Sequence, residues 1–276
     1  MMAESTVRPA AVAGRFYPAN RQALSDMIGG FLAEVESDQG ISRAVIVPHA
    51  GLIYSGQCAA AVFQRVILPR VVVIMAPNHT GLVDAPGGAS LWARGSFETP
   101  LGAVLIAESF ARQLEDRCRL VAHDPEAHRA EHAVEVELPF IATLAPGAKI
   151  VPIVLAWDDW NRCRELATDL AELIEEWPDE VLLVASSDMT HFESASRAAE
   201  KDRKALAAIE RLDAEALLEV CRRERITMCG RAPAAVALET ARQLGATRAE
   251  VVDYRHSGWV TGDDSSVVGY AGVVVT

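Results

Sequence analysis

The stretch from Val71 to Gly81 reads Val-Val-Val-Ile-Met-Ala-Pro-Asn-His-Thr-Gly. Its apolar part lacks period-2 alternation, which is typical of a central strand covered by helices on both faces. Similar β-branched runs occur at residues 44–47, 150–154, 181–184 and 267–275. Because helical stretches separate these runs, the sequence predicts an α/β fold with a mostly parallel central sheet and helices on both faces.

The helical stretches are expected at roughly 55–68, 103–117, 131–144, 159–176, 196–211, 213–223 and 231–244. Pro233 falls in the first turn of the last helix, where its missing N–H costs little. The Pro/Gly-rich piece from Asp84 to Gly88 is expected to be a loop over one edge of the sheet. No linker, repeat or low-complexity segment divides the chain, so we expect residues 1–276 to form a single domain.

Composition excludes several classes of protein. The chain has 276 residues, of which 50% are hydrophobic and 23% charged, as in a globular protein with a large core. A net charge of −12 disfavours nucleic acid as a partner, because nucleic-acid binding depends on clustered Lys and Arg. Neither a signal-peptide pattern nor an apolar run of the ~20 residues that a membrane span needs is found. We therefore expect a cytoplasmic protein without a nucleic-acid or membrane partner.

The five cysteines are odd in number and form no CxxC pair, which argues against a disulfide framework and a zinc ribbon. Four lie in helical patterns and are expected to be buried apolar residues: Cys58, Cys118, Cys163 and Cys221. Cys229 differs because it precedes a glycine near the start of a predicted helix. A helix N-terminus lowers the pKa of a thiol and favours a nucleophilic or metal-binding thiolate. The alternative is a buried thiol that packs against the helix cap.

Three apolar runs end in a histidine. The segments read Pro48-His-Ala-Gly51, Pro77-Asn-His-Thr-Gly81 and Ser186-Ser-Asp-Met-Thr-His191. The carboxyl ends of parallel strands meet at one edge of a sheet, so His49, His79 and His191 can meet in space and build a metal or catalytic site. The glycine two residues after each of the first two histidines lets the backbone turn sharply. A single histidine in such a position would more often be an ordinary hydrogen-bonded loop residue.

Other candidate cleft residues rest on weaker patterns. His132 and Glu135 are three residues apart on the predicted helix 131–144, so they would share a face and line the cleft. A surface pair on that helix is an equally good interpretation. Tyr54, together with Phe16 and Tyr17, is a candidate aromatic wall of the same cleft, although aromatic residues at the ends of elements are more often part of the core.

Several spaced motifs carry a family resemblance. They are Arg8-Pro-Ala-Ala-Val-Ala-Gly-Arg-Phe-Tyr-Pro18, Pro-His-Ala-Gly, Pro-Asn-His-Thr-Gly, Glu131-His-Ala-Val-Glu-Val-Glu-Leu-Pro-Phe140, Ser186-Ser-Asp-Met-Thr-His-Phe192, Cys229-Gly and Val267-Val-Gly-Tyr-Ala-Gly272. Together, from about Val7 to Val275, they resemble the Memo family, whose prokaryotic members are called AmmeMemoRadiSam system protein B.

The resemblance implies a fold similar to the catalytic subunit of class III extradiol dioxygenases, which use non-haem Fe(II). It also implies that His49, His79 and Cys229 are the metal ligands. A soft thiolate in place of the dioxygenase carboxylate shifts preference toward copper or zinc while still permitting iron. Asp188 and His191 match the Asp-x-x-His of the family motif and are candidates for the acid/base pair, with Asp188 either orienting His191 or accepting from a ligand.

Two functions remain open on these residues. The first is a non-haem metal-dependent oxidoreductase, similar to a dioxygenase, that acts on a small or aromatic substrate. The second is a non-catalytic, metal-containing module that binds a peptide or protein, since the family is also linked to phosphotyrosine-peptide binding in eukaryotes. Metal-assisted hydrolysis fits the ligands as well. The family name further implies a functional link to the other AmmeMemoRadiSam system proteins.

Overall fold

The computed structural model describes residues 7–276, and its centre is a sheet whose inner strands are parallel. These strands pair in the order β2 (Ala44–Val47), β9 (Val181–Ser186), β3 (Val71–Pro77) and β8 (Lys149–Leu155). Nearly every residue of the four is buried. Burial on both faces explains why these runs show no alternation in the sequence.

The outer strands make the sheet mixed, so the expectation of a mostly parallel sheet holds only for its centre. Beside β2, β12 (Val267–Val275) is antiparallel, and it pairs in turn with β11 (Ala249–His256) and β10 (His191–Glu193), both antiparallel. Beside β8, β4 (Ala89–Leu91) is antiparallel and is followed by β7 (Val121–His123). A short connection joins β11 to β12, and only an antiparallel pair can be joined in this way.

Three further strands form a second sheet, separate from the main one. It consists of β1 (Val7–Arg8), β5 (Ser96–Thr99) and β6 (Gly102–Leu105). The predicted helix 103–117 is therefore wrong in its first part, because residues 102–105 pair with β5 as a hairpin. Helix α3 begins only at Glu108 and ends at Arg117.

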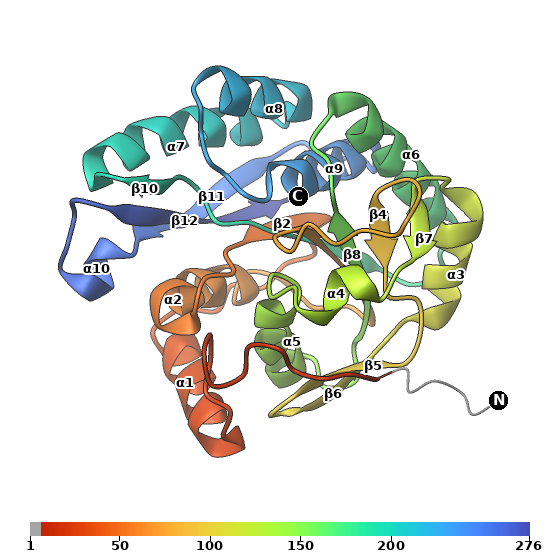
Figure 1. Ribbon diagram of the computed structural model, residues 1–276, viewed down its shortest axis with the longest axis horizontal. Coiled ribbons are helices and arrows are strands. Elements are labelled where there is room, and N and C mark those ends of the chain that lie inside the picture. Colours follow the sequence, from red (N-terminus) through yellow and green to blue (C-terminus); the bar gives the residue numbers. More distant parts are fainter. Residues whose placement is uncertain (1–6) are drawn as a thin grey trace.

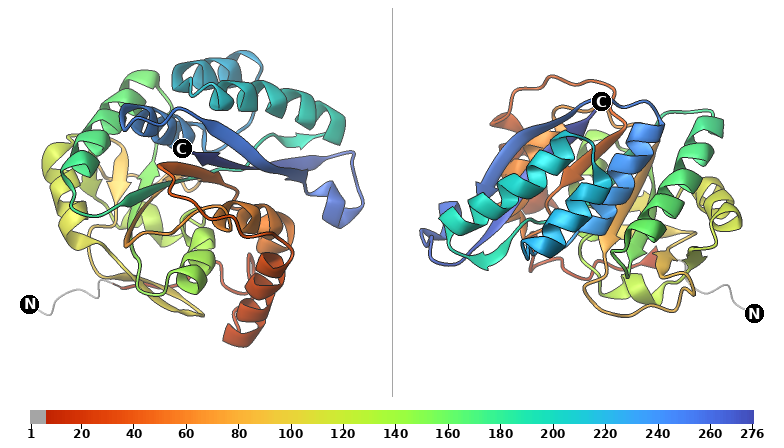
Figure 2. Two further views of the ribbon diagram at one scale, coloured as in Figure 1. Left: turned by 180° about the vertical axis from the view of Figure 1, so that it is seen from behind. Right: turned by 90° about the horizontal axis from the view of Figure 1, so that it is seen from above.

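Helices cover both faces of the main sheet, as predicted (Figure 1). One layer contains α6 (Trp160–Glu176), α7 (Ala195–Glu210), α8 (Ala214–Arg223) and α9 (Arg231–Gln243), which lie side by side in the right-hand view of Figure 2. The opposite layer contains α1 (Arg21–Ala33), α2 (Leu52–Phe63) and α5 (Leu138–Leu144). The short helices α4 (Glu126–Arg129) and α10 (Gly258–Thr261) lie in connections.

The helices of the first layer agree with the prediction to within one residue, whereas the predicted helix 131–144 is wrong in its first half. Residues 131–134 are irregular, a 3-10 turn η1 spans Glu135–Glu137, and α5 follows with Pro139 in its first turn. Proline suits a helix start because it lacks the N–H that would bond to a preceding turn. The acidic side chains before it bond to distant segments, as described below.

Among residues 7–276, none of the helices combines the length and the hydropathy that a membrane crossing requires.

Candidate metal site

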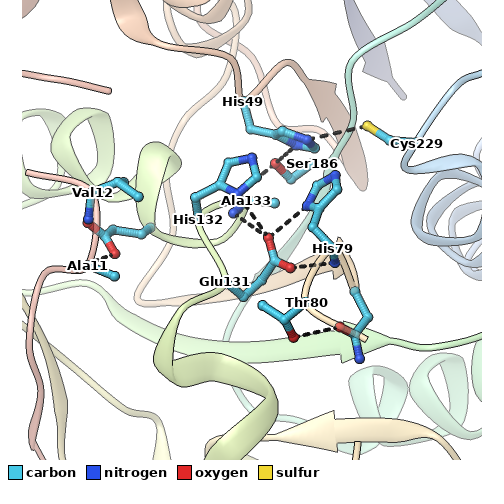
Figure 3. A network of polar contacts seen from close by, with 12 residues as sticks. Ala11, Val12, His49, His79, Thr80, Glu131, His132, Ala133, Ser186 and Cys229 are labelled. Carbon is cyan, nitrogen blue, oxygen red and sulfur yellow. Dashed lines mark hydrogen bonds and ion pairs between the residues drawn. The ribbon is translucent and has the colours of Figure 1, made fainter. Parts of the chain in front are cut away.

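The carboxyl edge of the parallel strands brings three predicted ligands together. His49 lies two residues after β2, His79 lies two residues after β3, and Cys229 lies just before α9. Their ligand atoms all lie within 4.8 Å of one another. His49 Nε2 and Cys229 Sγ lie 3.3 Å apart (Figure 3). Two imidazoles and a thiol in this arrangement fit zinc, copper or iron.

A buried carboxylate orients His79. Glu131 Oε1 lies 2.8 Å from His79 Nδ1, and Glu131 Oε2 accepts the backbone N–H of His79 at 2.6 Å. Because a carboxylate accepts, Nδ1 carries the hydrogen and Nε2 keeps a free lone pair. Burial opposes ionisation of Glu131, but its hydrogen bonds with His79 and Ala133 N–H hold its pKa below the usual value. The same contact raises the pKa of His79 although burial alone would lower it.

A hydroxyl orients His49. Its Nδ1 lies 2.8 Å from Ser186 Oγ, and its backbone N–H donates to Asp188 Oδ1 at 2.8 Å. Burial lowers the pKa of His49 well below its usual value, and the neighbouring histidines His132 and His79 add to this effect. A neutral imidazole is the form that binds metals.

The predicted low pKa of Cys229 is wrong. Burial raises its pKa above the usual value, and the nearby Asp188 carboxyl raises it further, although the N–H of Asp188 points at the sulfur from 3.3 Å. Helix α9 begins only at Arg231 after the N-cap Gly230, so the dipole of its N-terminus does not overcome burial at Cys229. A metal ion would displace the thiol proton, because only the thiolate binds metals well.

His132 joins the cluster from a loop and not from the predicted helix. Its ring stacks on His79 with 4.6 Å between centroids, and Phe16 packs on it at 4.7 Å. With His79 and Glu131 it forms a second group that could hold a metal ion. Glu135 does not share its face: this carboxylate turns away and accepts hydrogen bonds from Arg8 and Tyr17. Tyr17 is thus part of the core, whereas Phe16 lines the histidine cluster.

The predicted acid/base residues lie beside the cluster but bond to different partners. Asp188 Oδ1 accepts the N–H groups of His49 and Ala50, and burial raises the pKa of Asp188 to about 6. The ring of His191 is oriented by Thr227, whose carbonyl accepts from Nδ1 at 3.0 Å. Asp188 therefore holds the loop of His49, and Thr227 orients His191. Tyr54 is half-buried in the first turn of α2, close to Gly51.

Comparison with known proteins shows the family of this chain. The family model described as Memo-like protein matches residues 8–274. The chain belongs to the Memo-like family. A MEMO1 family protein of Aquifex aeolicus is 40% identical over 273 residues, with 97% of this chain and 98% of that protein covered. The MEMO1 family protein MK0963 of Methanopyrus kandleri is 36% identical over 280 residues, with 97% and 98% covered.

A solved structure shares the fold alone. The crystal structure of the uncharacterized protein JW3007 from Escherichia coli K12 matches with a TM-score of 0.57 and 14% identity, covering 84% of this chain and 99% of that one. The likeness supports the α/β architecture of this Memo-like chain and says nothing about its chemistry.

Sequence reasoning missed the residues that hold the candidate site histidines in place. Glu131, Ser186 and Thr227 each bond to a histidine of the site. Glu131 and Ser186 stand within the quoted Memo motifs, beside His132 and Asp188 respectively. An acidic residue directly before a histidine was the available signal for Glu131.

Proposed function

We propose that this Memo-like protein binds about one transition-metal ion per chain through His49 Nε2, His79 Nε2 and Cys229 Sγ. The observation that carries the proposal is the orientation of the two imidazoles. In each ring Nδ1 contacts a protein group, which leaves Nε2 as the atom that can bind a metal, and Nε2 of His49 lies 3.3 Å from Cys229 Sγ. Copper, iron and zinc all fit this donor set, with the thiolate favouring the softer ions.

The proposed activity is that of a non-haem metal-dependent oxidoreductase, similar to class III extradiol dioxygenases in fold and reaction, acting on a small or aromatic substrate. A bound metal would supply Lewis-acid and redox chemistry. A cavity of about 290 Å³ supports a small substrate, because Cys229 lines it together with Pro77, Trp157 and Arg231. His191 is the proposed proton-transfer group, since Thr227 holds its Nδ1–H and leaves Nε2 free. Asp188 would assist it.

A second candidate is a non-catalytic metal-containing module that binds a peptide or protein. The observation that favours it is a pair of exposed aromatic side chains: Phe192, next to His191, is 80% exposed, and Trp259 on α10 is 64% exposed. Strand β12 pairs with β10, which carries Phe192, and with β11, which precedes α10, and Figure 1 shows β10 and α10 on the same side of the molecule. Exposed apolar patches often mark interaction sites.

Two further parts of the proposal concern the setting. The other AmmeMemoRadiSam system proteins are the proposed functional partners, whichever of the two candidate functions holds. A cytoplasmic location is supported by the five free thiols, because such thiols persist in a reducing compartment.

The test is metal content and oxygen uptake. The protein is purified anaerobically, its metals are measured by mass spectrometry, and oxygen consumption is followed over a panel of phenolic compounds. We expect His49→Ala and His79→Ala to weaken metal binding by more than the roughly 10- to 100-fold that loss of an outer contact causes. His256→Ala, at the end of β11, is the matched control and should retain the metal. Unchanged stoichiometry in both site variants would refute the metal site, and a metal-loaded protein that only binds peptides would favour the second candidate.

A further inference from the structure

Ser186, the hydroxyl that orients His49, also contacts a buried glutamate. Glu137 lies in the turn η1 and is completely buried. Its Oε1 lies 2.7 Å from Ser186 Oγ, the hydroxyl that also contacts His49, while its Oε2 has no hydrogen-bond partner. We infer that Glu137 is a neutral carboxylic acid which donates to Ser186 and thereby fixes the ring of His49. It would be a positioning residue, and its effect on metal affinity rests on the proposed function.

The number of donors and acceptors around Ser186 Oγ requires a protonated Glu137. Three atoms surround Ser186 Oγ: Ala133 O and His49 Nδ1, each at 2.8 Å, and Glu137 Oε1 at 2.7 Å. A hydroxyl has one hydrogen to donate and two lone pairs that accept. The carbonyl of Ala133 can only accept, so the hydrogen of Ser186 belongs to that contact. His49 Nδ1 and Glu137 Oε1 must then both donate, and a carboxyl oxygen donates only when it is protonated.

The alternative arrangement is unfavourable. If Glu137 were ionised, Ser186 would donate to it, and the two oxygens of Ser186 and Ala133 would face each other at 2.8 Å with no hydrogen between them. A carboxylate would also be buried without a cation. Glu135, two residues earlier, shows the contrast: it is equally buried, but Arg8 pairs with it at 2.6 Å.

Electrostatics agree with the hydrogen count. Burial raises the pKa of Glu137 well above its usual value, and the nearby Asp188 raises it further. A hydrogen bond donated by Ser186 to an ionised Glu137 would lower this pKa, but it would offset the effect of burial only in part. A buried carboxyl group without a counter-charge commonly stays protonated, because an isolated buried charge is far more costly than neutralisation.

The two imidazoles are thus oriented by partners that differ in charge, one ionised and one neutral. His79 gives its Nδ1 hydrogen to the ionised Glu131, and His49 gives its Nδ1 hydrogen to a serine whose second lone pair is taken by a neutral acid. Both arrangements leave Nε2 deprotonated, and Figure 3 shows the contact that joins the ring of His49 to Cys229. Groups of this kind fix the tautomer and orientation of histidine ligands.

The experiment compares Glu137→Gln with Glu137→Ala. A glutamine amide can donate to Ser186 as a protonated glutamate does, so Glu137→Gln should bind Co(II) and Zn(II) within about threefold of the natural protein, whereas Glu137→Ala should lose roughly 10- to 100-fold. Competition titration gives the affinities. Infrared difference spectra at neutral pH should show a protonated carboxyl band that Glu137→Gln lacks.

The controls separate the possible failures. Ser186→Ala should lower affinity as Glu137→Ala does, and it replaces that variant if Glu137→Ala does not fold. An affinity loss in Glu137→Gln equal to that of Glu137→Ala, or no protonated band that depends on Glu137, would overturn the inference. The infrared band is measured on metal-free protein, so it decides the protonation of Glu137 even if the natural protein binds no metal and the proposed function fails.

Discussion

At the scale of single residues, each candidate ligand is restrained by one partner. Ser186 restrains His49, Glu131 restrains His79, and the backbone N–H of Asp188 points at Cys229. Such restraint lowers the entropy that is lost when a metal binds, since the donors are already in place. Of the three candidate ligands, Cys229 is the one that differs from a site of two histidines and one carboxylate. The accessibility of its thiol is therefore the first property to measure.

We expect Cys229 to react fastest with iodoacetamide among the five cysteines of the metal-free protein. Cys229 is the one that is partly exposed, whereas Cys58, Cys118, Cys163 and Cys221 are buried. Adding Zn(II) or Cu(I) should protect it, because the sulfur is then coordinated. Mass-spectrometric mapping of the labelled sites, with and without metal, measures both effects. Equal labelling of Cys229 and a buried cysteine would identify it as a packing residue.

Asp188 and His191 should affect reaction more than metal binding. In Asp188→Asn the remaining side-chain oxygen can still accept the N–H groups of His49 and Ala50, so the loop should keep its position. His191→Ala removes a ring that Thr227 orients, and His191 is not one of the candidate metal ligands. We expect nearly unchanged metal content and an activity loss of roughly 10²–10⁴-fold, the usual contribution of general acid/base groups. Metal loss equal to that of His49→Ala would show that the ligands are misassigned.

At the scale of elements, the inner strands and the helices α6 to α9 could be predicted, because their apolar periodicity is local. The convergence of His49 and His79 followed from the strand ends. The segment 131–137 could not be predicted in the same way. Its glutamates bond to residues far away in the chain, Glu131 to His79 and Glu135 to Arg8, so its shape depends on contacts that no local pattern records. The outer strand β12 was predicted as the run 267–275, whereas the outer strands β4 and β10 were missed, because each is only three residues long.

The junction between α9 and the sheet should be sensitive to one methyl group. A Cβ at Gly230 would collide with the carbonyl oxygen of Ser186 and lie 2.5 Å from Ser187 Cβ. Gly230→Ala must therefore push α9 and Cys229 away from β9. We expect a destabilisation of about 1–3 kcal/mol and weaker metal binding. Gly29→Ala, in helix α1 with no atom within 4 Å of the added Cβ, is the control and should be neutral or stabilising. Equal effects of the two substitutions would contradict the proposed close fit.

At the scale of the whole molecule, the start of the described chain is tied to the candidate metal site through a buried ion pair. Arg8 donates to Glu135 Oε2 at 2.6 Å and to the carbonyl oxygens of His128 and Glu131 at 2.7 and 2.5 Å. Neither Arg8 nor Glu135 has an exposed side chain. The backbone of Glu131 is therefore held by Arg8 while its side chain orients His79, so the N-terminal segment supports the site from more than a hundred residues away.

Arg8→Ala should destabilise the protein by about 3–5 kcal/mol, because it leaves the Glu135 carboxylate buried without its partner. Adding Glu135→Gln should recover part of this loss, since a neutral amide needs no counter-charge. Urea unfolding followed by circular dichroism measures the stability, and Co(II) titration of the folded fraction measures the site. Arg43→Ala is the control, because Arg43 pairs with Glu180 on the surface, where such pairs contribute about 0–1 kcal/mol. We expect weaker Co(II) binding in Arg8→Ala and unchanged binding in Arg43→Ala. If Arg8→Ala is destabilised but binds Co(II) as tightly as the natural protein, the ion pair supports the fold without positioning Glu131.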